Sequence, residues 1–246
     1  MSKPSTRKAA PRPAPQRRSQ AERREAARER ILDAAEELFG KHGYYGVTLR
    51  DVAAQAEADT ALLHYYFDGK AGLFDEVVAR RAETVNRARF DSLERYEREH
   101  ADAMTARGIV SAYLTPTFNF LMTGDAGMRH YARVVAKVNS TGVSDDFNVS
   151  VTPFDPVVHK MASMLKRVRP DVSEADVYWF YHMMSGAISL SLAETGRIDA
   201  LSGGRCKSAD FAAILDRMTA IFGAGFDGLR PEQASSDRRP RKPRTK

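Results

Sequence analysis

Residues 30–78 read RILDAAEELFGKHGYYGVTLRDVAAQAEADTALLHYYFDGKAGLFDEVV, and this stretch decides the fold. Its apolar side chains recur every three or four residues, as they do along one face of an α-helix. Ile31 and Phe39 lie on such a face of a first helix, expected over about 23–43. Gly43 follows it, and glycine is the residue that most often ends a helix.

Two short helices are expected next. Thr48 is a good N-cap residue with Asp51 three positions on, which is the pattern of a capping box. Asp59 is a second N-cap residue, and the helix it begins is predicted to run to about Tyr66. A supporting helix followed by two short helices and a tight turn is the outline of a helix-turn-helix. We therefore expect a helix-turn-helix domain at residues 21–70.

The rest of the chain also predicts helices. Alternating runs of Val, Ile and Thr are absent, so the expected fold class is all-α, with about nine helices. Pro116 is expected to kink or split one of them. A second helical domain is expected at residues 71–228. Its helices are predicted at about 70–100, 105–123, 127–140, 153–168, 173–196 and 208–223.

The positive charge of this chain lies at its two ends. Residues 1–20 contain six Lys and Arg with no acid, and residues 235–246 contain six with one acid, within a net charge of +6. The remainder is therefore net −5. We expect disordered basic segments at 1–20 and 229–246, which either keep the protein soluble or contact DNA phosphates.

Several classes of protein are excluded by what the sequence lacks. No apolar run is long enough to span a membrane, and the basic N-terminus lacks the apolar core of a signal peptide, so a cytoplasmic protein is expected. The single Cys206 has no partner for a disulfide and no metal-ligand spacing around it. With no Gly-rich phosphate loop and no G-x-S-x-G motif, we expect neither an enzyme nor a bound cofactor or metal.

Residues 28–80 resemble the N-terminal domain of TetR-family transcriptional regulators. The segment ILDAAEELFGKHGY matches the first helix of that family, and Thr48 with Leu49 matches the entry to its second helix. LLHYYF followed by Gly-Lys matches the third helix and the start of the fourth. One departure is Glu57, which stands in the turn where the family usually has glycine.

The resemblance implies binding to operator DNA, with the third helix in the major groove. The base-facing positions carried over are Thr60, Ala61, Leu62 and Tyr65. The phosphate contacts carried over are Thr48, Arg50, His64, Tyr66 and Lys70. Leu63 is expected in the core, and His64 is equally well read as a solvated surface residue. Because residues 21–80 are net −4, we also expect the 1–20 segment to supply part of the positive charge.

The C-terminal part is more distantly similar to a subgroup that includes regulators of fatty-acid metabolism. The similarity lies in TGDAGMRHYARVVAKV at 123–138 and VYWFYHMMSGA at 177–187. It implies a helical domain that binds a small-molecule effector and forms a homodimer through about 173–196 and 208–223. The alternative for the apolar residues of these two helices is an intramolecular core.

Aromatic and methionine side chains at helical spacing predict an adaptable apolar ligand cavity, although plain core packing is an alternative for each residue. The candidates are Tyr113, Phe118, Met122, Tyr131, Met161, Trp179, His182 and Met183. The sequence thus predicts a repressor that a largely apolar effector releases from DNA. The alternative is a helical protein-protein interaction module whose DNA-binding domain has degenerated.

Overall fold

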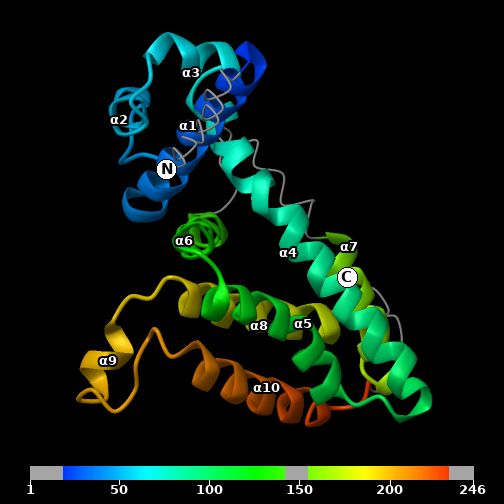
Figure 1. Cartoon of the computed structure of the whole chain (residues 1–246). Helices are drawn as coiled ribbons and strands as arrows, with labels where there is room; N and C mark the ends of the chain where they lie inside the picture. The colour runs from blue at the N-terminus through cyan, green and yellow to red at the C-terminus, as the bar shows by residue number, and fades with distance from the viewer. Residues whose placement is uncertain (1–18, 142–154, 233–246) are drawn as a thin grey trace, which may run out of the picture.

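The computed structural model describes residues 19–141 and 155–232, and within them the chain consists of helices without strands. Figure 1 shows a small N-terminal body and a larger C-terminal body, with the long helix α4 running from one into the other. The all-α prediction is confirmed. The described part holds ten α-helices and a short 3-10 helix, against the nine helices expected.

The N-terminal body contains the three predicted helices of the helix-turn-helix. Its helices are α1 (Gln20–His42), α2 (Leu49–Gln55), α3 (Thr60–Phe67) and the start of α4 (Lys70–His100). α1 begins three residues earlier than expected because Ser19 and Glu22 form a capping box. It ends at Gly43, whose φ of 72° only glycine adopts without strain.

In the C-terminal body most of the remaining helices pack around one core. The remaining helices are η1 (Ala101–Ala103), α5 (Ala106–Thr123), α6 (Ala126–Thr141), α7 (Asp155–Val168), α8 (Glu174–Leu192), α9 (Arg197–Leu201) and α10 (Phe211–Asp227). Of these, η1 and α9 contribute no buried residue to the core. Large side chains from four helices meet in this core: Tyr113, Phe118, Leu165, Phe180 and Phe226. In the described part of the chain, no helix combines the length and apolar character needed to cross a membrane.

Of the two effects expected of Pro116, a kink or a split, the split does not occur, and two other predicted details of these helices are wrong. α5 continues through Pro116 without a break, and the side chains around the proline, such as Leu114 and Phe118, are fully buried. We attribute the intact helix to this packing, which offsets the lost hydrogen bond. α8 ends at Leu192, because Glu194 lies at φ 45°. The short α9 was not predicted, since its N-cap is Gly196 without any side-chain cap.

Helices α4 and α6 connect the two bodies. The first turns of α4 bury Leu73, Phe74 and Val77 in the N-terminal core, so this core extends beyond the expected boundary at residue 70. Val134 of α6 belongs to the same core, and Figure 1 shows α6 between the two bodies. A displacement of α6 would therefore reach the N-terminal body directly. The two basic ends, apart from residues 19–20 and 229–232, lie outside the described residues.

Candidate nucleic-acid interface

Helix α3 is anchored on one side and exposed on the other. Asp59 caps it by accepting a hydrogen bond from the backbone N–H of Ala61 at 2.8 Å. Leu63 and Phe67 bury its inner side in the N-terminal core, at 0% and 4% exposure. Tyr65 lies on the outer side and is 75% exposed. The helix is therefore rigidly held while its outer face is open to a partner.

The structure brings most of the predicted base-facing residues onto this outer face. Ala61, Leu62 and Tyr65 are exposed, together with His64, whereas Thr60 and Tyr66 are half-buried. The rings of Tyr65 and Tyr66 meet edge to face, with centroids 5.4 Å apart. Tyr66 thus supports Tyr65 from the side. Leu63 is core, as expected.

Three of the predicted phosphate-contacting residues, Thr48, Arg50 and Lys70, lie at the N-terminal ends of α2 and α4, whereas His64 and Tyr66 lie on α3. Thr48 and Asp51 form the expected capping box, in which the Thr48 hydroxyl donates to the Asp51 carboxylate at 2.7 Å. That hydroxyl proton is already used, and the backbone N–H groups of Thr48 and Asp51 donate within the same capping box, so the exposed Arg50 side chain is better placed to donate to a phosphate. These hydrogen bonds also hold the pKa of Asp51 below its usual value.

Lys70 stands at the first position of α4. Its ammonium lies 4.2 Å from the ring centroid of Tyr44, and partial burial lowers the pKa of Lys70. Gly69 precedes it as the N-cap and supplies no side-chain hydrogen bond, which leaves the first N–H groups of α4 without a capping side chain. A cation beside such a helix end suits an anion such as a phosphate oxygen.

The turn between α2 and α3 has the conformation that favours glycine. Glu57 lies at φ 50°, as the departure from the family pattern suggested. A non-glycine residue there costs about 1–2 kcal/mol in backbone strain. The exposed carboxylate also stands next to the interface, where it would repel DNA.

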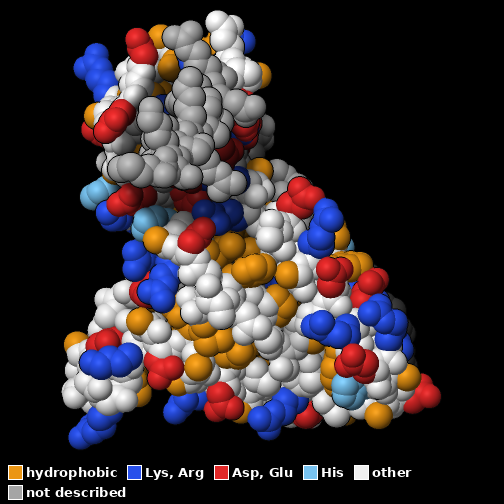
Figure 2. All heavy atoms as spheres, viewed as in Figure 1, with side chains coloured by type: hydrophobic (Ala, Val, Ile, Leu, Met, Phe, Trp, Pro, Cys, Tyr) orange, Lys and Arg blue, Asp and Glu red, His pale blue; other side chains and the backbone are white. Residues whose placement is uncertain are grey.

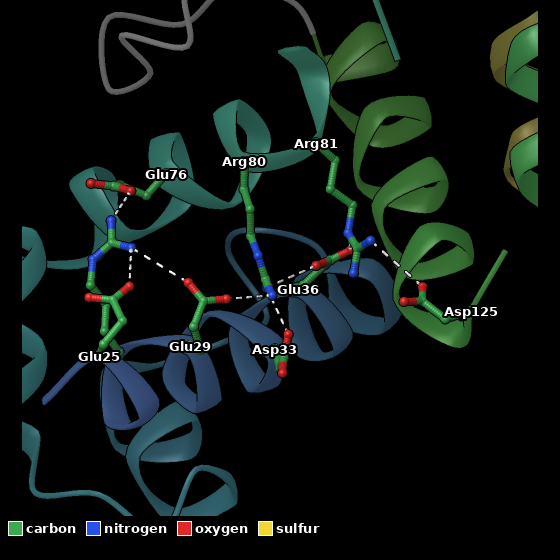
Figure 3. A network of polar contacts seen from close by, with 9 residues as sticks. Glu25, Glu29, Asp33, Glu36, Glu76, Arg80, Arg81 and Asp125 are labelled. Atoms are coloured by element: carbon green, nitrogen blue, oxygen red, sulfur yellow. Dashed lines mark hydrogen bonds and ion pairs between the residues drawn. The ribbon is translucent and has the colours of Figure 1, made fainter. Parts of the chain in front are cut away.

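Half of the twelve acidic residues at 21–80 form ion pairs in the structure. Figure 3 shows arginines between α1 and α4 surrounded by carboxylates. Arg28 pairs with Glu76 at 2.5 Å, and Arg80 pairs with Glu29 at 2.8 Å and Asp33 at 2.7 Å. This network places the paired carboxylates beside arginines of the same body, but it leaves the net charge of residues 21–80 at −4.

Arg81 joins three helices in this network. It pairs with Glu36 of α1 at 2.7 Å and with Asp125 at 3.6 Å, just before α6 (Figure 3). Glu36 is only 1% exposed, and its burial raises its pKa although Arg81 and Arg80 oppose the shift. α6 also approaches α1 closely, since a Cβ on Gly40 would lie 2.9 Å from the carbonyl oxygen of His130. These contacts tie the C-terminal body to α1.

The C-terminal body contains a cavity of about 250 Å³ between α4, α5, α6 and α8. Tyr113 and Tyr131 line it, as predicted. The sequence did not single out Arg89, Thr117 and Tyr181, which line it as well.

The other predicted ligand residues lie elsewhere. Phe118 and Met161 are fully buried core residues that do not line this cavity. Four more are exposed because they lie on the outer sides of α5 and α8: Met122, Trp179, His182 and Met183. The structure thus does not bring the eight predicted residues together around one cavity.

One face of α8 carries an exposed apolar stripe. Trp179, Met183 and Leu190 are 60%, 64% and 66% exposed, and Gly186 between them has open space around it. Ile221 of α10 is also 66% exposed. Figure 2 shows hydrophobic side chains gathered on the surface of the C-terminal body below α6. Exposed apolar groups in such numbers are typical of an interaction surface.

Comparisons with known proteins agree with this fold and site. Residues 31–77 match the model of the tetR family of bacterial regulatory proteins, and residues 111–225 match the tetracyclin repressor-like C-terminal domain. Together the two matches cover about two thirds of the chain. The chain belongs to the TetR family of transcriptional regulators.

Curated relatives match in the N-terminal part. The probable HTH-type regulator YttP of Bacillus subtilis is 33% identical over 54 residues, which is 22% of this chain and 26% of YttP. The negative regulator IcaR of the biofilm operon icaADBC in Staphylococcus aureus is 37% identical over 51 residues, 21% of this chain and 27% of IcaR. The matches thus span about a quarter of these relatives. All are transcription regulators, which supports the expectation that this chain is not an enzyme.

Solved structures show the same fold over most of the chain. PfmR, a TetR-family regulator from Thermus thermophilus, aligns with a TM-score of 0.54 at 15% identity, covering 83% of this chain and 98% of PfmR. HlyIIR, a hemolysin II transcriptional regulator, aligns with a TM-score of 0.51 at 17% identity, covering 80% of this chain and 98% of HlyIIR. At this identity the likeness concerns the fold alone.

Proposed function

We propose that this protein is a homodimeric, cytoplasmic regulator that binds operator DNA through α3 and represses transcription until a small, largely apolar effector binds. The exposed outer face of the anchored α3 is the observation that carries the proposal. It offers Ala61, Leu62 and Tyr65 to base edges. Arg50 and Lys70, with His64 and Tyr66, supply contacts to phosphates.

The dimer forms through the exposed faces of α8 and α10. A two-fold pair would bury the α8 stripe of Trp179, Met183 and Leu190 from both copies. The predicted contribution of α10 is smaller than expected from sequence, because Phe211 and Met218 are buried in the chain's own core. Ile221 is the apolar residue that α10 leaves for a partner.

The effector acts by shifting the population of two arrangements of the dimer. The cavity touches α4 and α6, and both helices contact the N-terminal body through Arg81, Glu36 and Val134. Binding would favour a spacing of the two α3 helices that no longer fits major grooves about 34–36 Å apart. By linkage, DNA weakens effector binding by the same factor.

A mobility-shift assay with the DNA upstream of the protein's own gene tests the proposal. The full chain should shift this DNA in preference to random duplex, and the Tyr65→Ala variant should not. If the alternative interaction module is correct, wild type and variant will both fail to select a sequence. Leu63→Ala is unsuitable here, because it would create a cavity in the core.

A further inference from the structure

We propose that the cavity between α4, α5, α6 and α8 recognises a small organic acid, whose carboxylate is bound by Arg89 and whose apolar body fills the remainder. This inference rests on the proposed function only in treating the acid as the effector. The binding itself follows from Arg89 and its surroundings.

Arg89 is a buried cation without an acidic partner. It is 7% exposed and lines the cavity. Its Nε donates to the Thr117 hydroxyl at 2.8 Å, and its guanidinium lies 4.7 Å from the ring centroid of Tyr113. Neither neighbour neutralises its charge. Among residues 19–141 and 155–232, no carboxylate lies within the 4.0 Å of an ion pair with Arg89.

Two other arginines of α4 differ from Arg89 in having acidic partners. Arg80 and Arg81 are less buried than Arg89, and both pair with carboxylates at 2.7 Å. An unpaired buried charge costs several kcal/mol unless a counter-ion binds to it. Asp155, which also lines the cavity, is exposed and makes no ion pair with Arg89. The terminal N–H groups of the guanidinium suit two parallel bonds to a carboxylate.

Two tyrosine hydroxyls lie near this guanidinium. The Tyr131 hydroxyl is buried, lines the cavity and has no hydrogen-bond partner. Tyr181 also lines the cavity, with Tyr113 and Ser185 as neighbours in the lining. Burial raises the pKa of both tyrosines, and the nearby charge of Arg89 partly opposes each shift. Both hydroxyls therefore keep their protons at neutral pH, and Tyr131 can donate to a bound oxygen.

The rest of the cavity is small and mostly apolar, with Asn139, Asp155 and Ser185 as further polar lining residues. Its walls include Val85, Phe120, Leu121, Met128, Val135 and Ile188. Its volume of about 250 Å³ is just below the ~300–1,000 Å³ typical of small-molecule sites. Arg89 is the only cation among its described lining residues, which favours a single carboxylate over a doubly charged phosphate. An organic cation would be repelled, and a neutral apolar compound would leave Arg89 unpaired.

Calorimetric titration of the full-length protein without DNA tests the inference. The probes are hexanoate and phenylacetate, each compared with its uncharged amide. At least one acid should bind at least tenfold more tightly than its amide. Arg89→Met keeps a side chain of similar apolar volume without the charge. In this variant the ratio of acid affinity to amide affinity should be at least tenfold lower than in wild type. Arg95→Met, at an exposed position of α4, is the matched control and should bind like wild type.

Thermal unfolding separates recognition from a structural role. If Arg89 serves a ligand, Arg89→Met removes an unpaired buried charge, so it folds and melts no lower than wild type. Equal binding of acids and amides, undetectable binding of both acids, or unchanged binding by Arg89→Met would overturn the inference. Because no DNA is present, Arg89-dependent acid binding would stand even if the mobility shift failed. A selective DNA shift without acid preference would refute only the inference.

Discussion

Replacing Leu190 by alanine tests the dimer face of α8. Leu190 is 66% exposed in the single chain and lies in line with Trp179 and Met183. If two copies pair through this stripe, Leu190 becomes buried only in the dimer. The two-fold axis repeats the contact, so one substitution removes it twice. The fold of each chain should be almost unaffected.

The expected loss follows from the exposed fraction. Fully burying a leucine side chain is worth about 1.5–3 kcal/mol. With two thirds of Leu190 exposed, the dimer loses about 1–2 kcal/mol per copy, or about 2–4 kcal/mol in total. At about 1.4 kcal/mol per tenfold change, the dissociation constant of the dimer should rise about 30- to 700-fold.

Sedimentation equilibrium over a range of concentrations measures this constant. Tyr45→Ala is the matched control, since Tyr45 is equally exposed at 66% but lies in the N-terminal body. Circular dichroism checks that both variants keep their helices. The reasoning is refuted if Leu190→Ala dimerises like wild type, or if Tyr45→Ala weakens the dimer equally.

Four further predictions concern DNA binding and pH. Tyr65→Ala should weaken operator binding by about 1–3 kcal/mol per half-site without changing dimerisation, as measured by fluorescence anisotropy; unchanged affinity would remove Tyr65 from the interface. Glu57→Gln should tighten DNA binding up to about fivefold at low salt and less at high salt, and an identical gain at all salt concentrations would contradict the electrostatic reason. Deleting residues 2–20 should flatten the slope of log affinity against log salt by about 0.9 for each lost phosphate contact, and an unchanged slope would exclude this segment from DNA binding. Burial raises the pKa of Glu36 in the folded protein above the ordinary value of 4.5. The stability that this raised pKa contributes is therefore fully present below pH 4.5 and is lost as pH rises through the folded-state pKa. Urea unfolding should therefore show Glu36→Gln gaining stability relative to wild type as pH rises above 4.5, whereas parallel curves would contradict the shift.

The N-terminal body was largely predictable because its determinants are local. Thr48 with Asp51, and Asp59 alone, form their predicted caps within three residues of sequence. The positive φ of Glu57 could also be expected, since the resemblance pointed to a glycine position. Ser19 was missed as the start of α1 although its capping-box partner Glu22 follows three residues later. That pattern was present in the sequence.

The cavity was harder to predict because its residues come from five helices, α4, α5, α6, α8 and, through Asp155, α7. Residue type marked Tyr113 and Tyr131, which line the cavity, but it marked Trp179 and Met183 equally, and these lie outside it. Which face of α8 points inward depends on packing against α6 and α10, which periodicity alone does not decide. A usable indication was Arg89 itself. Arg89 lies four residues from both Val85 and Leu93, on the face of α4 that these apolar residues bury. Arginine is seldom buried without a partner, so its place on this face indicates a specific role.

Selection of bound sequences from random duplex DNA tests the central claim most directly, namely that two exposed α3 helices read bases in a symmetric dimer. The wild-type protein should enrich an inverted repeat whose half-sites lie about 10 base pairs apart, or a multiple of that spacing. Tyr65→Ala should fail to enrich that repeat. If wild type enriches no sequence, or if Tyr65→Ala enriches the same repeat equally well, α3 does not have the role assigned to it.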